Sequence, residues 1–252
     1  MEPLLEVKNL TKVFKKKGQE TLSAVDHLNF CLYPGETLGI VGESGSGKST
    51  VARAVTRLLP VTEGKIYLEG REITGLKGRK LADVYREIQM VFQSPAGSFD
   101  PRRTLGDGIG ESLKNSGMGK AERKQRVAEL LRRCGLPEEY GRRYPHEVSG
   151  GECQRAAIAR ALAIRPKLLI CDEATSALDV TVQKQILELL AEIKKEEGMA
   201  YLFICHDLAL VQQFCDRVLV MENGKIVEEG PADEVILRPK EAYTRRLLES
   251  VL

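Results

Sequence analysis

The sequence contains no tryptophan, and aromatic residues make up only 5% of it. It also lacks any apolar run near the roughly 20 residues that a membrane-spanning helix needs. Its first residues show no basic start followed by an apolar core, which is the pattern of a secretory signal. We therefore expect a peripheral rather than an integral protein, if it works at a membrane at all.

The chain has almost no excess of charge of either sign. With 38 Lys and Arg against 36 Asp and Glu, the net charge is +2, so the broad positive field of a dedicated nucleic-acid binder is missing. Short basic clusters do occur, but aromatic residues are not interleaved with them. These clusters favour solvated faces, and no nucleic-acid partner is expected: Lys15 to Lys17, Arg102-Arg103, Arg132-Arg133 and Arg142-Arg143.

The six cysteines form no CxxC pair and no Cys/His spacing typical of a metal site. Cys171 and Cys205 lie inside apolar runs, where a small buried side chain is the expected role. This usage favours a reducing cytosol over an oxidising compartment.

The chain contains 252 residues of ordinary globular composition, enough for a full apolar core. Residues 37–41, 168–171 and 201–205 are short continuous apolar runs typical of buried strands. A helical pattern separates the last two, and its apolar face consists of Val182, Ile186, Leu189, Leu190 and Ile193. Alternation of buried strands and amphipathic helices predicts an α/β fold with a parallel sheet wound by helices.

Further elements surround this core. We expect short strands at residues 5–8, 28–32, 65–68 and 88–92, a helix at 48–59, and a hairpin of 217–221 and 225–228 across Asn223-Gly224. From residue 94 the chain becomes rich in Gly, Pro and Arg, with Val127, Leu130, Leu131 and Cys134 at helical spacing. The whole chain, 1–252, is predicted to be one domain. Residues 1–93 and 164–252 form its core with an antiparallel part, and 94–163 an inserted helical subdomain.

A glycine-rich motif follows the apolar run 37–41 and precedes the predicted helix. This strand–loop–helix context is the one that a GxxxxGK[ST] phosphate-binding loop requires. Its glycines let backbone N–H groups face a polyphosphate, its lysine can reach the β and γ phosphates, and the serine hydroxyl can ligate Mg²⁺. We therefore predict binding of ATP and Mg²⁺ by Gly42, Glu43, Ser44, Gly45, Ser46, Gly47, Lys48, Ser49 and Thr50.

Two acidic residues end the apolar run 168–171. Asp172 suits the Mg²⁺ shell, and Glu173 can polarise the water that attacks the γ phosphate. The alternative is that these carboxylates only cap the next helix.

Residues 148–155 begin with Val148, Ser149, Gly150, Gly151 and Glu152. Alone, a serine and two glycines before a helix can be a simple cap. Together with the motifs above, the chain resembles the ATP-binding subunits of ABC transporters from about residue 4 to 248. The segment is similar to that family's LSGGQ signature, with Val148 in place of Leu and Glu152 in place of Gln. The resemblance implies that Ser149, Gly150 and Gly151 contact the nucleotide held by the P-loop of a second subunit.

Other positions match this family in order. Gln93 resembles the Q-loop glutamine that contacts Mg²⁺ and the water, Asp179 of the segment 176–179 resembles the D-loop at the dimer interface, and His206 resembles the switch histidine near the γ phosphate. A lone histidine after a strand is otherwise more often structural. Phe14 is our candidate for stacking on adenine, with Tyr33 and Tyr67 as alternatives.

The segment 91–104 and residues 242–248 resemble the oligopeptide, dipeptide and nickel importers within this family. The resemblance implies an ATP-hydrolysing subunit at the cytoplasmic face of the cell membrane. It would pair with itself or with a related ATPase, act on two permease subunits and serve an extracytoplasmic solute-binding protein. Peptides and nickel or metal complexes both remain open as cargo, as does another small solute. Alternatives are a non-transport ABC ATPase of DNA repair or translation, a regulatory module that does not hydrolyse ATP, and an exporter.

Overall fold

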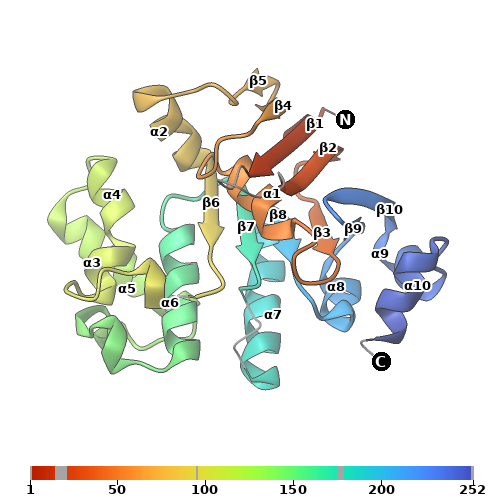
Figure 1. The fold of residues 1–252 in the computed structure, drawn as a ribbon. Helices are drawn as coiled ribbons and strands as arrows, with labels where there is room; N and C mark the ends of the chain where they lie inside the picture. Colours follow the sequence, from red (N-terminus) through yellow and green to blue (C-terminus); the bar gives the residue numbers. More distant parts are fainter. Residues whose placement is uncertain (1, 15–21, 95, 175–178, 251–252) are drawn as a thin grey trace.

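The computed structural model describes residues 2–14, 22–94, 96–174 and 179–250. Its central feature in these residues is a sheet with the strand order β10-β9-β3-β8-β7-β6 (Figure 1). All neighbours pair in parallel except β9 and β10, which form the expected antiparallel hairpin. The strands are β3 (Thr37–Val41), β6 (Ile88–Val91), β7 (Leu168–Asp172), β8 (Ala200–Ile204), β9 (Arg217–Glu222) and β10 (Lys225–Pro231). The predicted parallel core is confirmed.

A second, antiparallel sheet has the order β2-β1-β4-β5. It consists of β1 (Leu5–Phe14), β2 (Leu22–Leu32), β4 (Glu63–Leu68) and β5 (Arg71–Glu72). The expectation of short strands at 5–8 and 28–32 was wrong in length, because β1 and β2 extend well beyond those runs. The register between β1 and β2 shifts at several places, which breaks the apolar alternation by which a strand is recognised.

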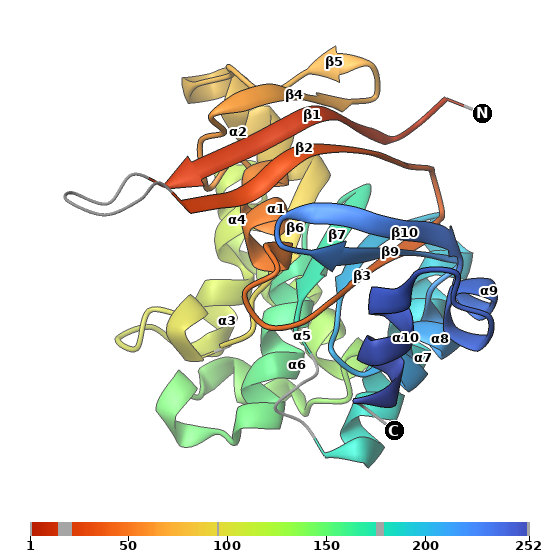
Figure 2. The same cartoon turned by 45° about the vertical axis from the view of Figure 1, so that its right-hand side comes forward.

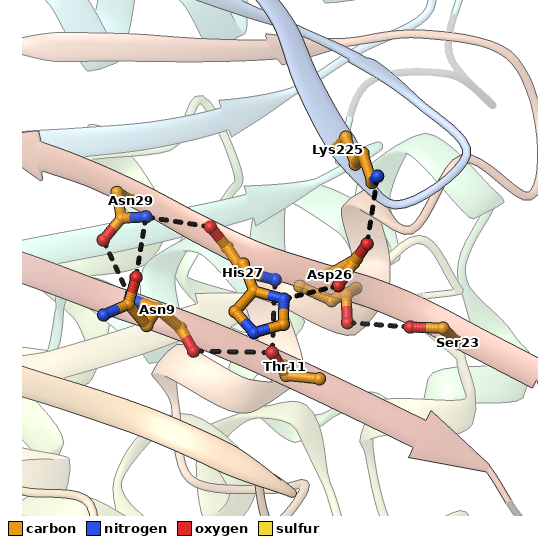
Figure 3. A network of polar contacts seen from close by, with 8 residues as sticks. Asn9, Thr11, Ser23, Asp26, His27, Asn29 and Lys225 are labelled. Carbon is orange, nitrogen blue, oxygen red and sulfur yellow. Dashed lines mark hydrogen bonds and ion pairs between the residues drawn. The ribbon is translucent and has the colours of Figure 1, made fainter.

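A polar network holds this irregular part of the two strands (Figure 3). Asn9 and His27 adopt left-handed φ values of 50° and 51°, which non-glycine residues rarely do. The Asn29 carboxamide accepts the Asn9 N–H at 2.8 Å and donates to the His27 carbonyl at 2.8 Å, while the Thr11 hydroxyl accepts the His27 N–H at 3.1 Å. Side chains therefore replace the strand-to-strand bonds that the bulges remove.

Helices cover both faces of the parallel sheet. The described residues form two hydrophobic cores, one on each face of this sheet, and alternate side chains of β8 belong to each. Leu202 and Ile204 pack in the first core with the antiparallel sheet and α1 (Lys48–Val55). Tyr201 and Phe203 pack in the second core with α7 (Val180–Glu197) and α8 (Leu208–Phe214). The predicted helix at 48–59 ends early, at Val55, because Arg57 has a left-handed φ of 61°. The helix α2 (Gly78–Glu87), not expected from the sequence, also packs with the first core.

The segment between β6 and β7 is helical in its described residues. It contains α3 (Leu105–Ile109), α4 (Glu111–Asn115), α5 (Lys120–Arg133) and α6 (Gly150–Leu162), with short 3₁₀ turns at Ala96–Ser98, Glu138–Arg142 and Pro145–Glu147. The expected apolar face of Val127, Leu130, Leu131 and Cys134 is buried. Because the core that it joins also contains α7 and α8, the inserted helices pack as one body with that face of the sheet.

The chain ends in two helices, α9 (Ala232–Leu237) and α10 (Ala242–Glu249), which lie beside β9 and β10 (Figure 2). Among the described residues, none of the helices combines the length and the apolar character that crossing a bilayer requires.

Candidate active site

The candidate residues gather along one edge of the parallel sheet. The P-loop follows the carboxyl end of β3, His206 follows β8, Asp172 ends β7, and Gln93 follows β6. These four strands are consecutive neighbours in the sheet and run in the same direction. Carboxyl ends of parallel strands form the usual binding edge of such sheets. Strand order thus brings together residues that lie far apart in the sequence.

The P-loop is built from glycine conformations that other residues rarely adopt. Gly42 and Gly47 have φ values of 146° and 106°, and an added Cβ at either position would lie within 2.3 Å of a backbone oxygen. Gly47 is also the N-cap of α1 and offers no side chain to its free amides. Ser44 and Gly45 are exposed at the tip of the loop, whereas Ser46 is buried. The loop therefore leaves a helix start available to an anion.

Lys48 is held inside the loop. Its side chain is buried, and its ammonium donates to the carbonyls of Gly42 at 2.8 Å and Glu43 at 2.7 Å. Burial lowers the pKa of Lys48, while the nearby carboxylates of Glu173 and Asp172 oppose this. These contacts hold the Lys48 ammonium at a defined position in the loop, where it can form an ion pair with a bound phosphate.

Two of the three residues predicted to contact Mg²⁺, Ser49 and Asp172, contact each other. The Ser49 hydroxyl donates to Asp172 Oδ1 at 2.8 Å, and burial raises the pKa of this carboxyl group. Oxygen donors of this kind suit Mg²⁺, which keeps phosphate and water oxygens as its other ligands. Among the described residues, no group of three or more His, Cys, Asp or Glu side chains could hold a metal ion. The capping alternative for these acids fails, because Asp179 caps α7 by accepting the Val182 N–H at 3.0 Å.

Glu173 is the centre of a three-residue contact. Its φ is 51°, and its N–H donates to the Ile204 carbonyl at 3.0 Å. One carboxylate oxygen accepts the Gln93 amide, and the other is hydrogen-bonded to His206 Nε2. Three strands thus deliver an acid, an amide and an imidazole to one point. The structure thus brings together three of the four residues that the sequence predicts to be catalytic, and the fourth, Lys48, lies in the P-loop at the same edge of the sheet.

The signature segment forms the start of α6, with Ser149 as N-cap. The Ser149 hydroxyl accepts the Glu152 N–H at 3.3 Å, and the Glu152 carboxylate accepts the Ser149 N–H at 2.7 Å, which completes a capping box. The Tyr140 hydroxyl donates to the other Glu152 oxygen at 2.8 Å. These bonds lower the pKa of Glu152, the Ser149 amide foremost. The unusual fifth residue therefore has a defined structural role as a charged cap.

Sequence reasoning missed one residue of the same helix. Gln154 is only 3% exposed and donates from Nε2 to the Ala174 carbonyl at 2.5 Å. It therefore connects the signature helix to the residue that follows Glu173. No local pattern signals this contact, because the partner is a main-chain atom of another element.

The structure favours one of the three aromatic candidates for adenine stacking. Phe14 pairs with Leu22 at the end of β1, close to Ala24, whose carbonyl abuts Gly47. Tyr67 pairs with Glu6, eight residues before Phe14 in β1, which is roughly 25 Å along a strand. Tyr33 lies before the amino end of β3, the end opposite the P-loop. Phe14 alone lies near the loop. Of the predicted D-loop, residues 176–178 lie outside the described residues.

Comparisons with known proteins agree with this geometry. A family model described as "ABC transporter" matches residues 25–176. The oligopeptide transport ATP-binding protein OppF of Bacillus subtilis (strain 168) is 48% identical over 253 residues, which cover 99% of this chain and 83% of that protein. The glutathione import ATP-binding protein GsiA of Salmonella paratyphi A is 48% identical over 99% of this chain, but the match spans only 41% of that longer protein.

A solved structure has the same fold. It is a dimeric ATP-binding cassette in a post-hydrolysis state bound to ADP and Pi, with a TM-score of 0.85 and 31% sequence identity. The match covers 90% of this chain and 98% of that one.

Proposed function

The chain belongs to the ABC transporter family, and on this basis we propose that it is the ATP-hydrolysing subunit of an importer that takes up peptides. The observation that carries the proposal is the contact of Glu173 with Gln93 and His206 at the sheet edge that also holds the P-loop. The 48% identity to an oligopeptide transport protein supports peptides as the class of cargo, and the 48% identity to a glutathione import protein supports import as the direction.

The proposed reaction is attack of water on the γ phosphate of ATP. The P-loop amides and Lys48 would hold the β and γ phosphates. Glu173 would accept the proton of the attacking water, Gln93 would orient that water, and His206 would donate a hydrogen bond toward the γ phosphate as charge develops there. Mg²⁺ would be held by Ser49 and Asp172 and would neutralise part of the phosphate charge.

The contact between Glu173 and His206 has a consequence for this mechanism. Each carboxylate oxygen of Glu173 is engaged by one side chain. Each oxygen has a second lone pair, which can accept a hydrogen bond from the attacking water. We expect the γ phosphate to attract His206 as well, which would leave more room for the water beside Glu173.

We further propose that the active unit is a dimer. Ser149 and the amides of Gly150 and Gly151 would contact ATP held by the P-loop of the second subunit, and Asp179 would lie at the dimer interface. The Ser149 hydroxyl accepts a bond from Glu152 in the capping box, so its own hydrogen is available to a phosphate oxygen. The dimeric state of the related cassette structure supports this arrangement. Whether the partner is a second copy or a related ATPase remains open.

A groove suits a permease partner at the cytoplasmic face of the membrane. A cavity of about 880 Å³ lies between α2, α4 and α5 and is lined by Tyr85, Gln89, Leu113, Met118 and Arg126, among others. Its wall includes β6, the strand that precedes Gln93. A segment of a permease seated there would reach the catalytic edge through Gln93. Two such permease subunits, fed by an extracytoplasmic solute-binding protein, would complete the importer.

The test has an enzymatic and a cellular part. The purified protein, alone and with a related ATPase from the same operon, should hydrolyse ATP with Mg²⁺, and Lys48→Ala should abolish this. Deletion of the gene should reduce uptake of labelled oligopeptides, with recovery by the wild type but not by Lys48→Ala. Loss of nickel uptake with normal peptide uptake would replace peptides by nickel as cargo. Copurification with ribosomes or DNA instead of a permease would favour the non-transport alternative.

A further inference from the structure

The C-terminal helix α10 contacts the P-loop through the buried side chain of Tyr243. The hydroxyl of Tyr243 accepts the backbone N–H of Glu43 at 3.1 Å, although the two residues lie 200 positions apart. Tyr243 is 7% exposed, and burial raises the pKa of its hydroxyl group. The hydroxyl is therefore neutral and its oxygen is aimed at the first turn of the loop.

The helix that carries Tyr243 is anchored independently of the loop. Glu228 of β10, itself 8% exposed, accepts the N–H groups of Lys240 at 2.9 Å and Glu241 at 3.2 Å, immediately before α10. These two bonds fix the chain just before the helix start, and they place the negative charge of Glu228 near the positive end of α10. Tyr243 thus extends from a support fixed to the sheet, which is the arrangement that a positioning residue needs.

The residue that Tyr243 holds also holds Lys48. The N–H of Glu43 donates to Tyr243, and the carbonyl of Glu43 accepts the Lys48 ammonium at 2.7 Å. The far side of the loop is fixed separately, because the Gly224 N–H donates to the Ser46 carbonyl at 3.0 Å. Tyr243 and the hairpin turn at Gly224 therefore support the loop at two different points.

We propose that Tyr243 is a positioning residue for nucleotide binding: it fixes the Glu43 peptide, and through it the Lys48 ammonium, in the geometry that receives a polyphosphate. The proposal rests on the ATP binding proposed above. It makes the C-terminal element part of the nucleotide site. Displacement of α10 should therefore lower the affinity for ATP although every group that contacts the phosphates is still present.

The test compares Tyr243→Phe with a matched control, Tyr201→Phe, in the full chain. Tyr201 is also a buried tyrosine, and its hydroxyl donates to the Leu190 carbonyl at 3.0 Å. Its partner lies in α7, away from the loop. For both variants and the wild type, the Kd for MgATP is measured by calorimetry, the melting temperature by circular dichroism, and KM and kcat by phosphate release.

We expect Tyr243→Phe to raise the Kd and KM for ATP roughly 3- to 30-fold, while kcat at saturating ATP stays within about twofold, because the lost interaction supports binding rather than the transition state. Tyr201→Phe should lower the melting temperature and leave the Kd unchanged. Glu228→Gln, which weakens the anchor of α10, should raise the Kd in the same direction as Tyr243→Phe.

Two outcomes overturn the role of Tyr243. One is a wild-type Kd for Tyr243→Phe, and the other is an equal loss of affinity in both tyrosine variants, which would indicate general destabilisation. A wild-type protein that binds no ATP would instead overturn the proposed function together with this role.

Discussion

The contact between the P-loop and the antiparallel sheet at Gly47 predicts a large difference in stability between two glycine-to-alanine substitutions in the loop. Gly45 and Gly47 both have left-handed φ values, of 84° and 106°. A Cβ at Gly45 would meet nothing within 4 Å, whereas a Cβ at Gly47 would lie 2.3 Å from the Ala24 carbonyl oxygen of β2. Only the second substitution forces the antiparallel sheet away from the P-loop.

The expected losses of stability have two causes, backbone strain and steric overlap of the added Cβ. Backbone strain at a left-handed position costs about 1–3 kcal/mol for a residue with a Cβ, and this term applies to both variants. Insertion of a carbon atom into a filled space adds about 1–3 kcal/mol, and this term applies to Gly47→Ala alone. We therefore expect Gly47→Ala to be less stable than Gly45→Ala by about 1–3 kcal/mol, against a total stability on the order of 5–15 kcal/mol.

The assay is urea unfolding without nucleotide, so that loss of ligand binding does not enter. With a slope of about 3 kcal/mol per M, the midpoint of Gly47→Ala should lie roughly 0.3–1 M below that of Gly45→Ala. Equal midpoints for the two variants would refute the contact between Gly47 and Ala24.

Three further predictions concern charged residues of the site. Glu173→Gln should retain ATP binding and lower kcat by roughly 10²- to 10⁴-fold; near-normal steady-state hydrolysis would exclude Glu173 as the general base. Glu152→Gln should keep the capping box but remove a negative charge from the start of α6. We therefore expect the dimer, measured by light scattering, to form at a several-fold lower ATP concentration. If the ATP concentration at half-maximal dimer formation is unchanged, this charge does not reach the partner's nucleotide. Burial raises the folded-state pKa of Asp172, so its ionised form destabilises the metal-free fold above that pKa, and the penalty disappears as the pH falls through it. Asp172→Asn should thus raise the melting temperature at pH 7 without Mg²⁺ while abolishing hydrolysis, and a lower melting temperature would contradict the burial argument.

The sequence alone is enough to place several candidate residues at one edge of the sheet, and the reason is physical. Buried parallel strands are short apolar runs, and the polar residue that ends such a run must lie at the edge of the sheet. Asp172 and His206 could be placed by this rule alone. Gln93 follows β6, which was predicted to span 88–92 and ends at Val91. This difference of one residue leaves Gln93 at the same edge of the sheet.

Contacts between distant elements could not be predicted in this way. The acceptor of the Glu43 N–H lies 200 residues away on a helix, and nothing in the local pattern around Glu43 distinguishes it. The helix α2 was not predicted because its apolar face is short, with Leu81, Val84 and Tyr85 at helical spacing among charged residues, and because only Val84 of these is buried. The length of β1 was underestimated because the left-handed Asn9 interrupts the alternation on which strand recognition depends.

The capping box of α6, the signature helix, places a negatively charged side chain at the start of this helix. The Glu152 carboxylate occupies the positive end of that helix, so in the proposed dimer the partner's γ phosphate would arrive where one negative charge is already bound. A dimer of two identical chains would carry this anion at both nucleotide sites, whereas a mixed dimer with a glutamine-bearing partner would carry it at one. The shape of the ATP-binding isotherm would then report subunit composition, with a single phase for the symmetric pair and two phases for the mixed one.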